Sequence, residues 1–295
     1  MAPKGFVRFA MPGAGRLEDF GQNDLEDRRP SGLTKAEGME AVLAQTTGFF
    51  RERPAERRLT AAFASVWVHC MQDRDAPPVV ITPDATIDLQ WIDGRFRIAG
   101  PDREPQIETL PSGATIVGFR FRPGAAAGWL GVPANRIVGE RLDLSDLWGT
   151  QARHLAGRIR ATPDLAELVG QLEEAIGAYA QDHRAPDAAM GFAFDVVDRG
   201  LPADKPLVPF LLRTLHMSER TLRRRFEENF GYGPKTLDRI LRFHRYRRLR
   251  QTSGDASTVV LAVEAGYSDQ AHLIRESRRL SGITPSALAD ASSRP

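Results

Sequence analysis

Residues 218–236 read SERTLRRRFEENFGYGPKT and place four arginines within six positions, beside the apolar Leu222 and Phe226. Successive residues of an α-helix are about 100° apart, so a helix over 218–230 sorts these side chains by face. The basic face carries Arg220, Arg223 and Arg224, and the opposite side carries Leu222, Arg225 and Phe226. The stretch therefore predicts a helix that is buried along one side and basic along the other.

The residues around this helix predict a helix-turn-helix. Upstream, PLVPFLLRTLH (206–216) is apolar enough for a short bracing helix, and a tight turn at His216 and Met217 joins the two. Ser218 is a suitable N-cap, and Gly231 supplies the stop. The second helix of such a unit lies in the major groove of B-DNA, where arginine donates two hydrogen bonds to guanine.

A surface helix without a ligand is the alternative interpretation of the basic face. Its arginines would then pair with Glu227 and Glu228, which lie toward the far end of the helix. These two acids cannot fully neutralise the arginines at the N-terminal end, so the pattern favours the interpretation as a DNA-binding helix.

The same pattern recurs in STVVLAVEAGYSDQAHLIRESRRLSG (257–282), which predicts a second helix-turn-helix. Gly266 supplies the turn, and Ser268 or Asp269 caps the second helix. Leu273 and Leu280 face inward in this helix. The outward side carries Gln270, Ala271, His272, Arg275 and Arg278. Gln270 and His272 lie at the N-terminal tip, where recognition helices meet base edges, and glutamine suits adenine.

One further helix is predicted between the two units. Residues 234–251 read PKTLDRILRFHRYRRLRQ, and their apolar positions are available for burial. These positions are Leu237, Ile240, Leu241 and Leu249. Two recognition helices joined by a stiff helix would enter successive segments of the major groove, about 34 Å apart.

These segments resemble the AraC/XylS-type transcription regulators over residues 205–290. The markers are SERTLRRRFEENFGYGPK, the arginine-rich helix after it, AGYSDQAHLIRE and SGITPSAL. The resemblance implies an all-α DNA-binding domain with two helix-turn-helix units, in a bacterial-type activator or repressor. It implies base-reading roles for Arg220, Arg223, Arg224, Gln270, His272 and Arg275. It implies phosphate contacts for Ser218, Thr221 and Ser268.

Four positions depart from the usual pattern of the family. Leu212 and His216 stand where a small residue and a glycine are usual, and Tyr246 stands where the middle helix has alanine. Ser277 replaces a core phenylalanine, and losing a core aromatic typically costs about 3–5 kcal/mol. We therefore expect the second unit to pack more loosely than usual unless its neighbours repack.

The front half of the chain shows strand patterns. Alternating apolar residues predict strands in 60–70, 85–92, 95–100 and 114–124, and Asp93-Gly94 predicts a hairpin turn between the second and the third. In the last strand, alternation separates two faces. One face carries Ile116, Gly118, Arg120 and Arg122, and the other carries Thr115, Val117, Phe119 and Phe121.

Helical patterns follow the strands. A helix after residue 143 would be capped by Asp143 or Ser145, and a helix starting at Pro163 would be capped by Thr162. A third helix over 185–199 is stopped by Gly200.

Two stretches of the front half resemble an uncharacterised N-terminal domain of many AraC-type regulators. They are ITPDATIDLQWIDGRFRIAGP and GFRFRPGAAAGWLGVPANRIVGERLDLSDLWG, within residues 57–180. The resemblance implies a sensory or assembly role, and by analogy a small β-barrel or half-barrel. The expected fold class is therefore α+β, with a small β-rich, barrel-like N-terminal domain with helices followed by an all-α double helix-turn-helix domain.

Four segments are expected along the chain. Residues 1–50 would form a flexible or partly helical arm, in which Thr34 and Glu37 suit the start of a short helix over 34–50. The other segments are a sensor or assembly domain with C-terminal helices over 51–182, a helical connector and linker over 183–206, and the DNA-binding domain over 207–295.

Composition separates the two parts and narrows the class of protein. The last 95 residues carry 17 Lys and Arg against 10 Asp and Glu, whereas the first 200 carry 23 against 28. A basic C-terminal third suits a polyanion such as double-stranded DNA. No apolar run is long enough to span a membrane, and no signal-peptide core is seen at the N-terminus. A single cysteine, Cys70, excludes an internal disulfide and suits the cytoplasm.

No catalytic motif, metal-binding spacing or cofactor-binding motif is found, so we expect a protein that is not an enzyme and has no cofactor. Two alternatives remain open: an enzyme domain fused to a DNA-binding module, and a regulator or repair protein that accepts alkyl groups on Cys70. A cysteine in an apolar strand is more often a small buried side chain.

A small-molecule effector, a second copy of the chain and, for an activator, RNA polymerase are the remaining partners considered. Candidate residues for an effector pocket are Trp67, Trp91, Arg97, Arg120 and Arg122. The simpler interpretation of these residues is core tryptophans and solvated arginines.

Overall fold

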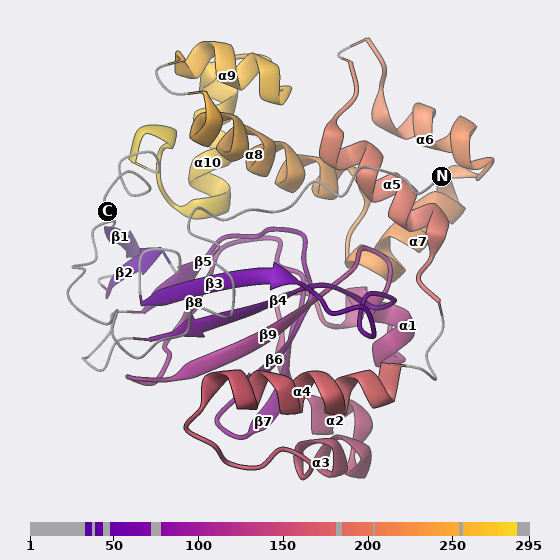
Figure 1. Ribbon diagram of the computed structural model, residues 1–295. Coiled ribbons are helices and arrows are strands. Elements are labelled where there is room, and N and C mark those ends of the chain that lie inside the picture. Colours follow the sequence, from indigo (N-terminus) through magenta and orange to yellow (C-terminus); the bar gives the residue numbers. More distant parts are fainter. Residues whose placement is uncertain are drawn as a thin grey trace.

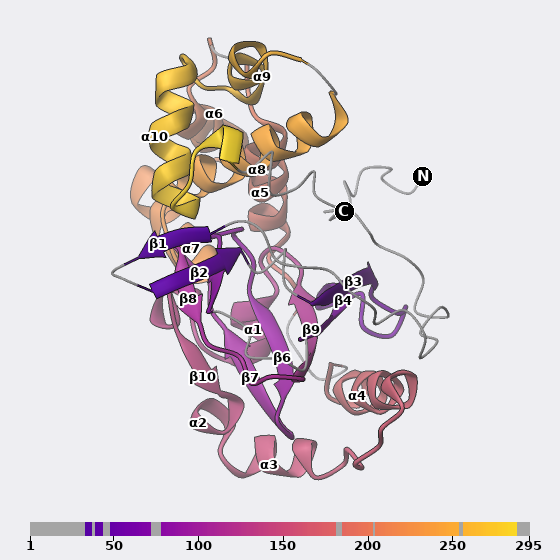
Figure 2. The same ribbon diagram turned by 90° about the vertical axis from the view of Figure 1, so that its left-hand side faces the viewer.

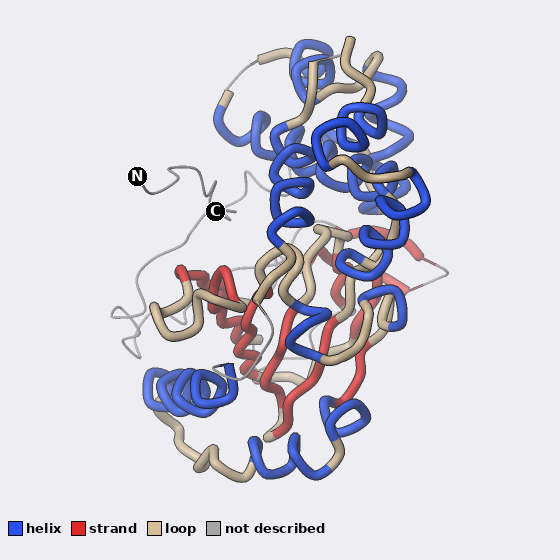
Figure 3. The backbone as a smooth tube through the Cα atoms, turned by 90° about the vertical axis from the view of Figure 1, so that its right-hand side faces the viewer, coloured by secondary structure: helices blue, strands red, loops and turns tan. Residues whose placement is uncertain are grey.

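The computed structural model describes residues 33–36, 39–43, 48–71, 78–180, 185–202, 204–253 and 256–287. Strands dominate the front half and helices the C-terminal third, which confirms the expected α+β class (Figure 1). The strands lie between two groups of helices (Figure 3).

A six-stranded antiparallel sheet forms the centre of the front half, in the order β10-β7-β6-β9-β4-β3. Its strands are β3 (Phe49–Pro54), β4 (Phe63–Cys70), β6 (Asp88–Ile92), β7 (Arg95–Ala99), β9 (Thr115–Phe121) and β10 (Arg141–Asp143). Asp93 and Gly94 both have positive φ, 49° and 75°, as a two-residue hairpin requires, and they join β6 to β7 as predicted.

A second sheet, with the order β1-β2-β5-β8, lies beside the first. Its strands are β1 (Leu33–Ala36), β2 (Met39–Leu43), β5 (Val79–Ile81) and β8 (Gln106–Glu108). The helix over 34–50 is wrong, because β1 and β2 pair as a hairpin and β2 continues in parallel with β5. The sheets stay open at their edges, so the barrel-like closure is also wrong. Residues 1–32 of the expected arm lie outside the described part of the chain.

Helices cover one face of the six-stranded sheet (Figure 2). They are α1 (Ala126–Leu130), the 3₁₀-helix η3 (Ala134–Arg136), α2 (Leu144–Trp148), α3 (Thr150–Ala156) and α4 (Leu165–Ala180). Asp143 caps α2 through the Ser145 amide at 2.8 Å. The expected Thr162 cap of α4 is wrong, since Asp164 accepts the amides of Ala166 and Glu167 at 2.8 and 3.1 Å.

The main core fills the space between this face and the helices. Strand residues such as Val117 and Phe119 pack with Trp129 of α1 and with Leu172 and Ile176 of α4. This is the apolar face predicted from alternation in 115–121.

Six helices form the C-terminal part among the described residues. They are α5 (Ala188–Arg199), α6 (Leu207–Leu215), α7 (Glu219–Phe230), α8 (Pro234–Thr252), α9 (Thr258–Ala265) and α10 (Gln270–Ser281). One core contains Leu222, Phe226 and Leu241, together with Met190 and Phe194 of α5. Helix α5, expected as a connector, therefore packs into the core of the helix-turn-helix region.

A smaller core supports the second unit and accommodates its unusual residues. Tyr246 packs with Leu261, Ala265 and Leu273, so the larger side chain in α8 fills the space between α8 and α9. Ser277 is fully buried, and its hydroxyl donates to the Ile283 carbonyl at 2.8 Å. The lost phenylalanine is thus replaced by a satisfied hydrogen bond.

The two parts of the chain meet along α7 and its C-terminal turn. Gly231 has φ of 82°, and a Cβ there would lie 2.6 Å from Val138 Cγ2, so this turn packs tightly on the front half. Arg103 Nη2 donates to the Gly231 carbonyl at 2.8 Å. The Asp187 amide, just before α5, donates to Gly124 O at 3.3 Å.

We predict a pH dependence of stability from Glu173 of α4. Burial raises the pKa of Glu173 to about 7, although Arg53 of β3 donates to its carboxylate at 2.8 Å. The folded-state pKa lies above the unfolded one, so this contribution is fully present below about pH 4.5 and is lost as the pH rises through 7.

Urea unfolding of the wild-type chain should show a free energy about 1–3 kcal/mol lower at pH 8 than at pH 5 from this group. Glu173→Gln keeps an acceptor for Arg53 and should flatten that difference. Identical pH profiles for the two proteins would contradict the assignment.

Candidate nucleic-acid interface and polar sheet face

The first recognition helix, α7, presents its basic face to solvent. Arg220, Arg223 and Arg224 are exposed, whereas Leu222 and Phe226 are fully buried. Ser218 caps the helix by accepting the Thr221 amide at 3.2 Å, and the two hydroxyls lie 2.9 Å apart. The helix therefore offers three guanidinium groups beside an N-terminus whose free amide groups favour anions.

Two of these arginines pair along the helix, as the alternative interpretation supposed. Arg223 donates to Glu227 and Arg224 to Glu228, each at 2.9 Å. Exposed pairs of this spacing are worth about 0.3–0.5 kcal/mol, and a bidentate guanine contact about 1–3 kcal/mol. The pairs can therefore exchange for a base contact at low cost. Arg220 makes no ion pair within the described chain.

Arg225 points away from this face and holds α7 in place. Its guanidinium forms a bidentate ion pair with Asp187, the N-cap residue of α5. In this pair Nε of Arg225 donates to Oδ2 of Asp187 at 3.1 Å. The same Asp187 carboxylate accepts the amides of Ala189 and Met190. One acid thus caps α5 and fixes the orientation of α7.

The turn before α7 explains one departure from the family pattern. His216 ends α6 with φ of 51° and ψ of 44°, in the left-handed region that glycine tolerates best. The Met217 amide donates to the Leu212 carbonyl at 3.2 Å, which closes the end of α6. A histidine here keeps the turn that glycine usually makes.

The second recognition helix, α10, has the same construction. Asp269 caps it by accepting the His272 amide at 2.7 Å, and this hydrogen bond lowers the pKa of Asp269. Gln270 and Arg275 are exposed, and His272 is half-buried. The Ser268 hydroxyl lies 3.2 Å from His272 Nδ1. The predicted base-reading residues of α10 therefore lie along its outer side, as those of α7 do.

Two arginines of α8, Arg245 and Arg248, make hydrogen bonds and an ion pair to neighbouring helices, which the sequence pattern did not indicate. Arg245 donates to the carbonyls of Val197 and Asp198, which end α5, and to that of Ala265, which ends α9, at 2.6–3.0 Å. Arg248 pairs with Asp198 at 2.8 Å. Helix α8 is thereby hydrogen-bonded to the C-terminal ends of α5 and α9.

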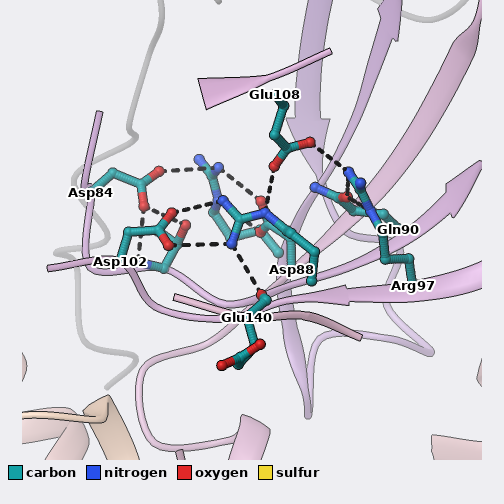
Figure 4. A network of polar contacts seen from close by, with 10 residues as sticks. Asp84, Asp88, Gln90, Arg97, Asp102, Glu108 and Glu140 are labelled. Atoms are coloured by element: carbon teal, nitrogen blue, oxygen red, sulfur yellow. Dashed lines mark hydrogen bonds and ion pairs between the residues drawn. The ribbon is translucent and has the colours of Figure 1, made fainter. Parts of the chain in front are cut away.

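The second face of the six-stranded sheet carries polar and charged side chains (Figure 4). Strand pairing aligns Trp67, Gly118, Gln90 and Arg97 in one row across β4, β9, β6 and β7. Arg120 and Asp88 lie in the adjacent row. A Cβ at Gly118 would lie 2.0 Å from the Trp67 ring, so only glycine lets this indole lie across β9.

Each arginine of this face meets more than one acceptor. Arg120 pairs with Asp88 at 3.1 Å, Asp84 at 3.3 Å and Glu52 at 3.6 Å. Arg97 donates to Gln90 and pairs with Glu108 at 3.1 Å. Arg141 pairs with Asp102 at 2.8 Å and also with Glu108.

The acids around Arg120 outnumber the cation. Burial raises the pKa values of Glu52 and Asp88, although Arg120 acts in the opposite direction on both. Burial alone would lower the pKa of Arg120, but Asp88, Asp84 and Glu52 together raise it. Arg120 therefore stays charged and is the centre of this cluster.

The five candidate residues for an effector pocket do not lie together in the structure. Trp67, Arg97 and Arg120 share the polar face, whereas Trp91 packs against Phe96 in the main core on the other side. Arg122 follows β9 and donates to the Thr60 carbonyl. The acids of the polar face were missed, although alternation in 88–92 places Asp88 and Gln90 on one side.

Cys70, the residue of the alkyl-acceptor alternative, is half-buried at the end of β4. The Thr115 hydroxyl lies 3.8 Å from its sulfur, and burial raises the pKa of the thiol. A raised pKa disfavours the nucleophilic thiolate.

No described helix is long and apolar enough to cross a membrane.

Two family models match the chain. Residues 211–291 match HTH_18, a helix-turn-helix domain, and residues 51–143 match DUF6597, a domain of unknown function. The first match confirms the resemblance to the AraC/XylS-type regulators, and the C-terminal part of the chain is an AraC-type helix-turn-helix domain. A search of curated proteins found no match.

Solved structures show a more distant likeness. Apo ToxT from Vibrio cholerae is 11% identical with a TM-score of 0.44, over 82% of this chain and 100% of that one. ToxT from Vibrio cholerae bound to an unsaturated fatty acid is 12% identical with a TM-score of 0.40, over 80% and 96%. The AraC-like transcriptional activator CuxR is 17% identical with a TM-score of 0.21, over 73% and 91%.

We predict that neutralising the acids of α7 strengthens DNA binding. Glu227→Gln and Glu228→Gln remove negative charge from the basic face and release Arg223 and Arg224. Each should raise affinity for duplex DNA at low salt, at a stability cost of about 0.3–0.5 kcal/mol. DNA titrations and urea unfolding measure the two effects.

Asp195→Asn is the matched control, since Asp195 forms the same kind of exposed pair with Arg199 on α5. It should leave DNA affinity unchanged. Unaltered or weaker DNA binding by both α7 variants would contradict the placement of this face against DNA.

Proposed function

We propose that this protein is a sequence-specific, DNA-binding regulator of transcription whose front domain responds to an effector or holds a dimer together. The observation that carries the proposal is the pair of exposed recognition helices, α7 and α10, within a domain that matches an AraC-type helix-turn-helix family. Such a protein acts on promoter DNA in the cytoplasm and needs no catalytic step.

The base-reading roles follow from side-chain chemistry. Arg220, Arg223 and Arg224 can donate to guanine in the major groove, and Gln270 can bond adenine in two places. His272 and Arg275 lie on the same side of α10. Ser218, Thr221 and Ser268 lie at the helix N-termini, where hydroxyl and amide groups suit phosphate oxygens. Phosphate contacts would supply salt-dependent affinity, and the base contacts would supply sequence preference.

An effector would act through the polar face of the sheet. Trp67, Arg97 and Arg120 lie there among buried acids, and the domain that carries them packs directly on α7. An effector changes regulation only if it binds two arrangements of the domains with different affinity. A homodimer through the front half and contact with RNA polymerase by an activator are compatible with this arrangement.

The test begins with selection of duplexes from a random-sequence library by the full chain. Arg223→Ala and Arg224→Ala should each weaken binding to the selected duplex by about 1–3 kcal/mol, because each removes a base contact. Binding to an unrelated duplex of equal length should change much less.

Arg199→Ala provides the control, since Arg199 is an exposed arginine of α5 in a similar ion pair. It should bind the selected duplex as the wild-type chain does. Failure of the wild-type chain to enrich any sequence, or an equal loss in all three variants, would contradict the proposed function.

A further inference from the structure

The connection between β5 and β6 belongs to the front half by sequence but packs into the C-terminal core. Val80 in β5 belongs to the cluster that contains Phe226 and Leu241, and Ala85 in the connection packs against it. Between them, the Pro83 carbonyl lies 2.7 Å from Nε2 of His244 in α8. Residues 82–87, called the coupling loop below, therefore reach the helix that joins the two recognition helices.

The hydrogen bond from His244 is that of a neutral imidazole. The charged groups that act on the pKa of the ring are Asp84 from the coupling loop and Arg247 and Arg248 from α8 itself. Burial, with a smaller effect from Arg247, lowers the pKa of His244 to about 4. At neutral pH the ring is uncharged, so Nε2 carries the proton that it donates to the carbonyl.

Asp84 fixes the shape of the coupling loop. Its Oδ1 accepts the Thr86 amide at 3.0 Å and the Thr86 hydroxyl at 2.7 Å, and its Oδ2 pairs with Arg120 at 3.3 Å. Burial opposes ionisation, but Arg120 and the hydrogen bonds from Thr86 lower the pKa of Asp84 below its ordinary value. The carboxylate is therefore ionised and tied both to its own loop and to the sheet.

These contacts, together with neighbouring positions along the chain, connect the sheet to α8. Arg120 of β9 forms an ion pair with Asp84, and the carbonyl of the adjacent Pro83 accepts a hydrogen bond from His244. His244 lies one position before Arg245, which donates to the ends of α5 and α9. Arg97 lies on the same face of the sheet, but its partners Gln90 and Glu108 belong to the front half. Arg120 alone of this pair is connected to α8.

We propose that Asp84 is a positioning residue for DNA recognition, which couples Arg120 in the sheet to α8 and so sets the arrangement of the two recognition helices. This inference rests on the proposed function. An effector that engages Arg120 would loosen the hold on Asp84 and thereby change the arrangement at the DNA.

The experiment compares Asp84→Asn in the full chain with the wild-type protein. Asparagine keeps the Oδ1 acceptor for Thr86 but removes the charge that pairs with Arg120. We expect faster hydrogen–deuterium exchange in the amides of α8 near His244. We also expect the ratio of affinities for the selected and unrelated duplexes to fall about 3–10-fold, with an unchanged salt dependence, because the phosphate contacts remain.

A double-mutant cycle separates coupling from general destabilisation. His244→Phe removes the donor to Pro83, and His244→Gln keeps an amide donor. Asp84→Asn and His244→Phe should be non-additive in the affinity ratio, because they break the same link between the sheet and α8, and His244→Gln should restore part of the loss. Arg53→Gln, which breaks the ion pair between β3 and Glu173 of α4 in the front half, should leave both readouts unchanged and be additive with His244→Phe.

Three outcomes would overturn the inference: unchanged exchange in α8 of Asp84→Asn, an unchanged affinity ratio, or additive effects in the cycle. Failure of the proposed function is distinguishable from these, since it appears as a wild-type chain that prefers no sequence. Exchange in α8 then still decides whether Asp84 couples the sheet to this helix.

Discussion

The guanidinium group of Arg245 is the contact on which the arrangement of the recognition helices depends. It lies in the middle of α8 and donates to the last carbonyls of α5 and of α9. The last carbonyls of a helix lack the amide donors of a following turn, so this one side chain supplies hydrogen bonds to two helix ends and joins three helices. Helix α5 is tied at its other end through Asp187 to Arg225 of α7. Helices α5 and α8 therefore form a common support for the two helix-turn-helix units.

The buried arginines and the exposed arginines of this protein have different roles. Inside, arginines meet carbonyls and acids, as Arg120 and Arg225 do, and their burial makes each contact specific in geometry. Outside, Arg220, Arg223 and Arg224 remain in water with at most a weak partner. A guanidinium that is exposed and lightly paired can be transferred to a base edge without a large desolvation cost, which suits a reader of DNA.

The sequence predicted the local elements well and the long-range contacts poorly. Helix α7, its Ser218 cap and the Asp93-Gly94 hairpin follow from periodicity and turn chemistry, and all three are present. The helix predicted over 34–50 is wrong because the pattern of β1 and β2 is short and the pairing of β2 with β5 depends on tertiary context. The ion pair of Asp187 with Arg225 and the contact of Pro83 with His244 join residues far apart in sequence, so no local pattern could indicate them.

A hydroxyl-radical footprint of the full chain on its selected duplex measures whether α7 and α10 enter the major groove together. Two recognition helices held by α8 should protect two stretches of backbone whose centres are about 10 base pairs apart, on one side of the duplex. A footprint confined to a single turn, or no protection at concentrations that shift the duplex, would show that the two helices do not bind DNA together.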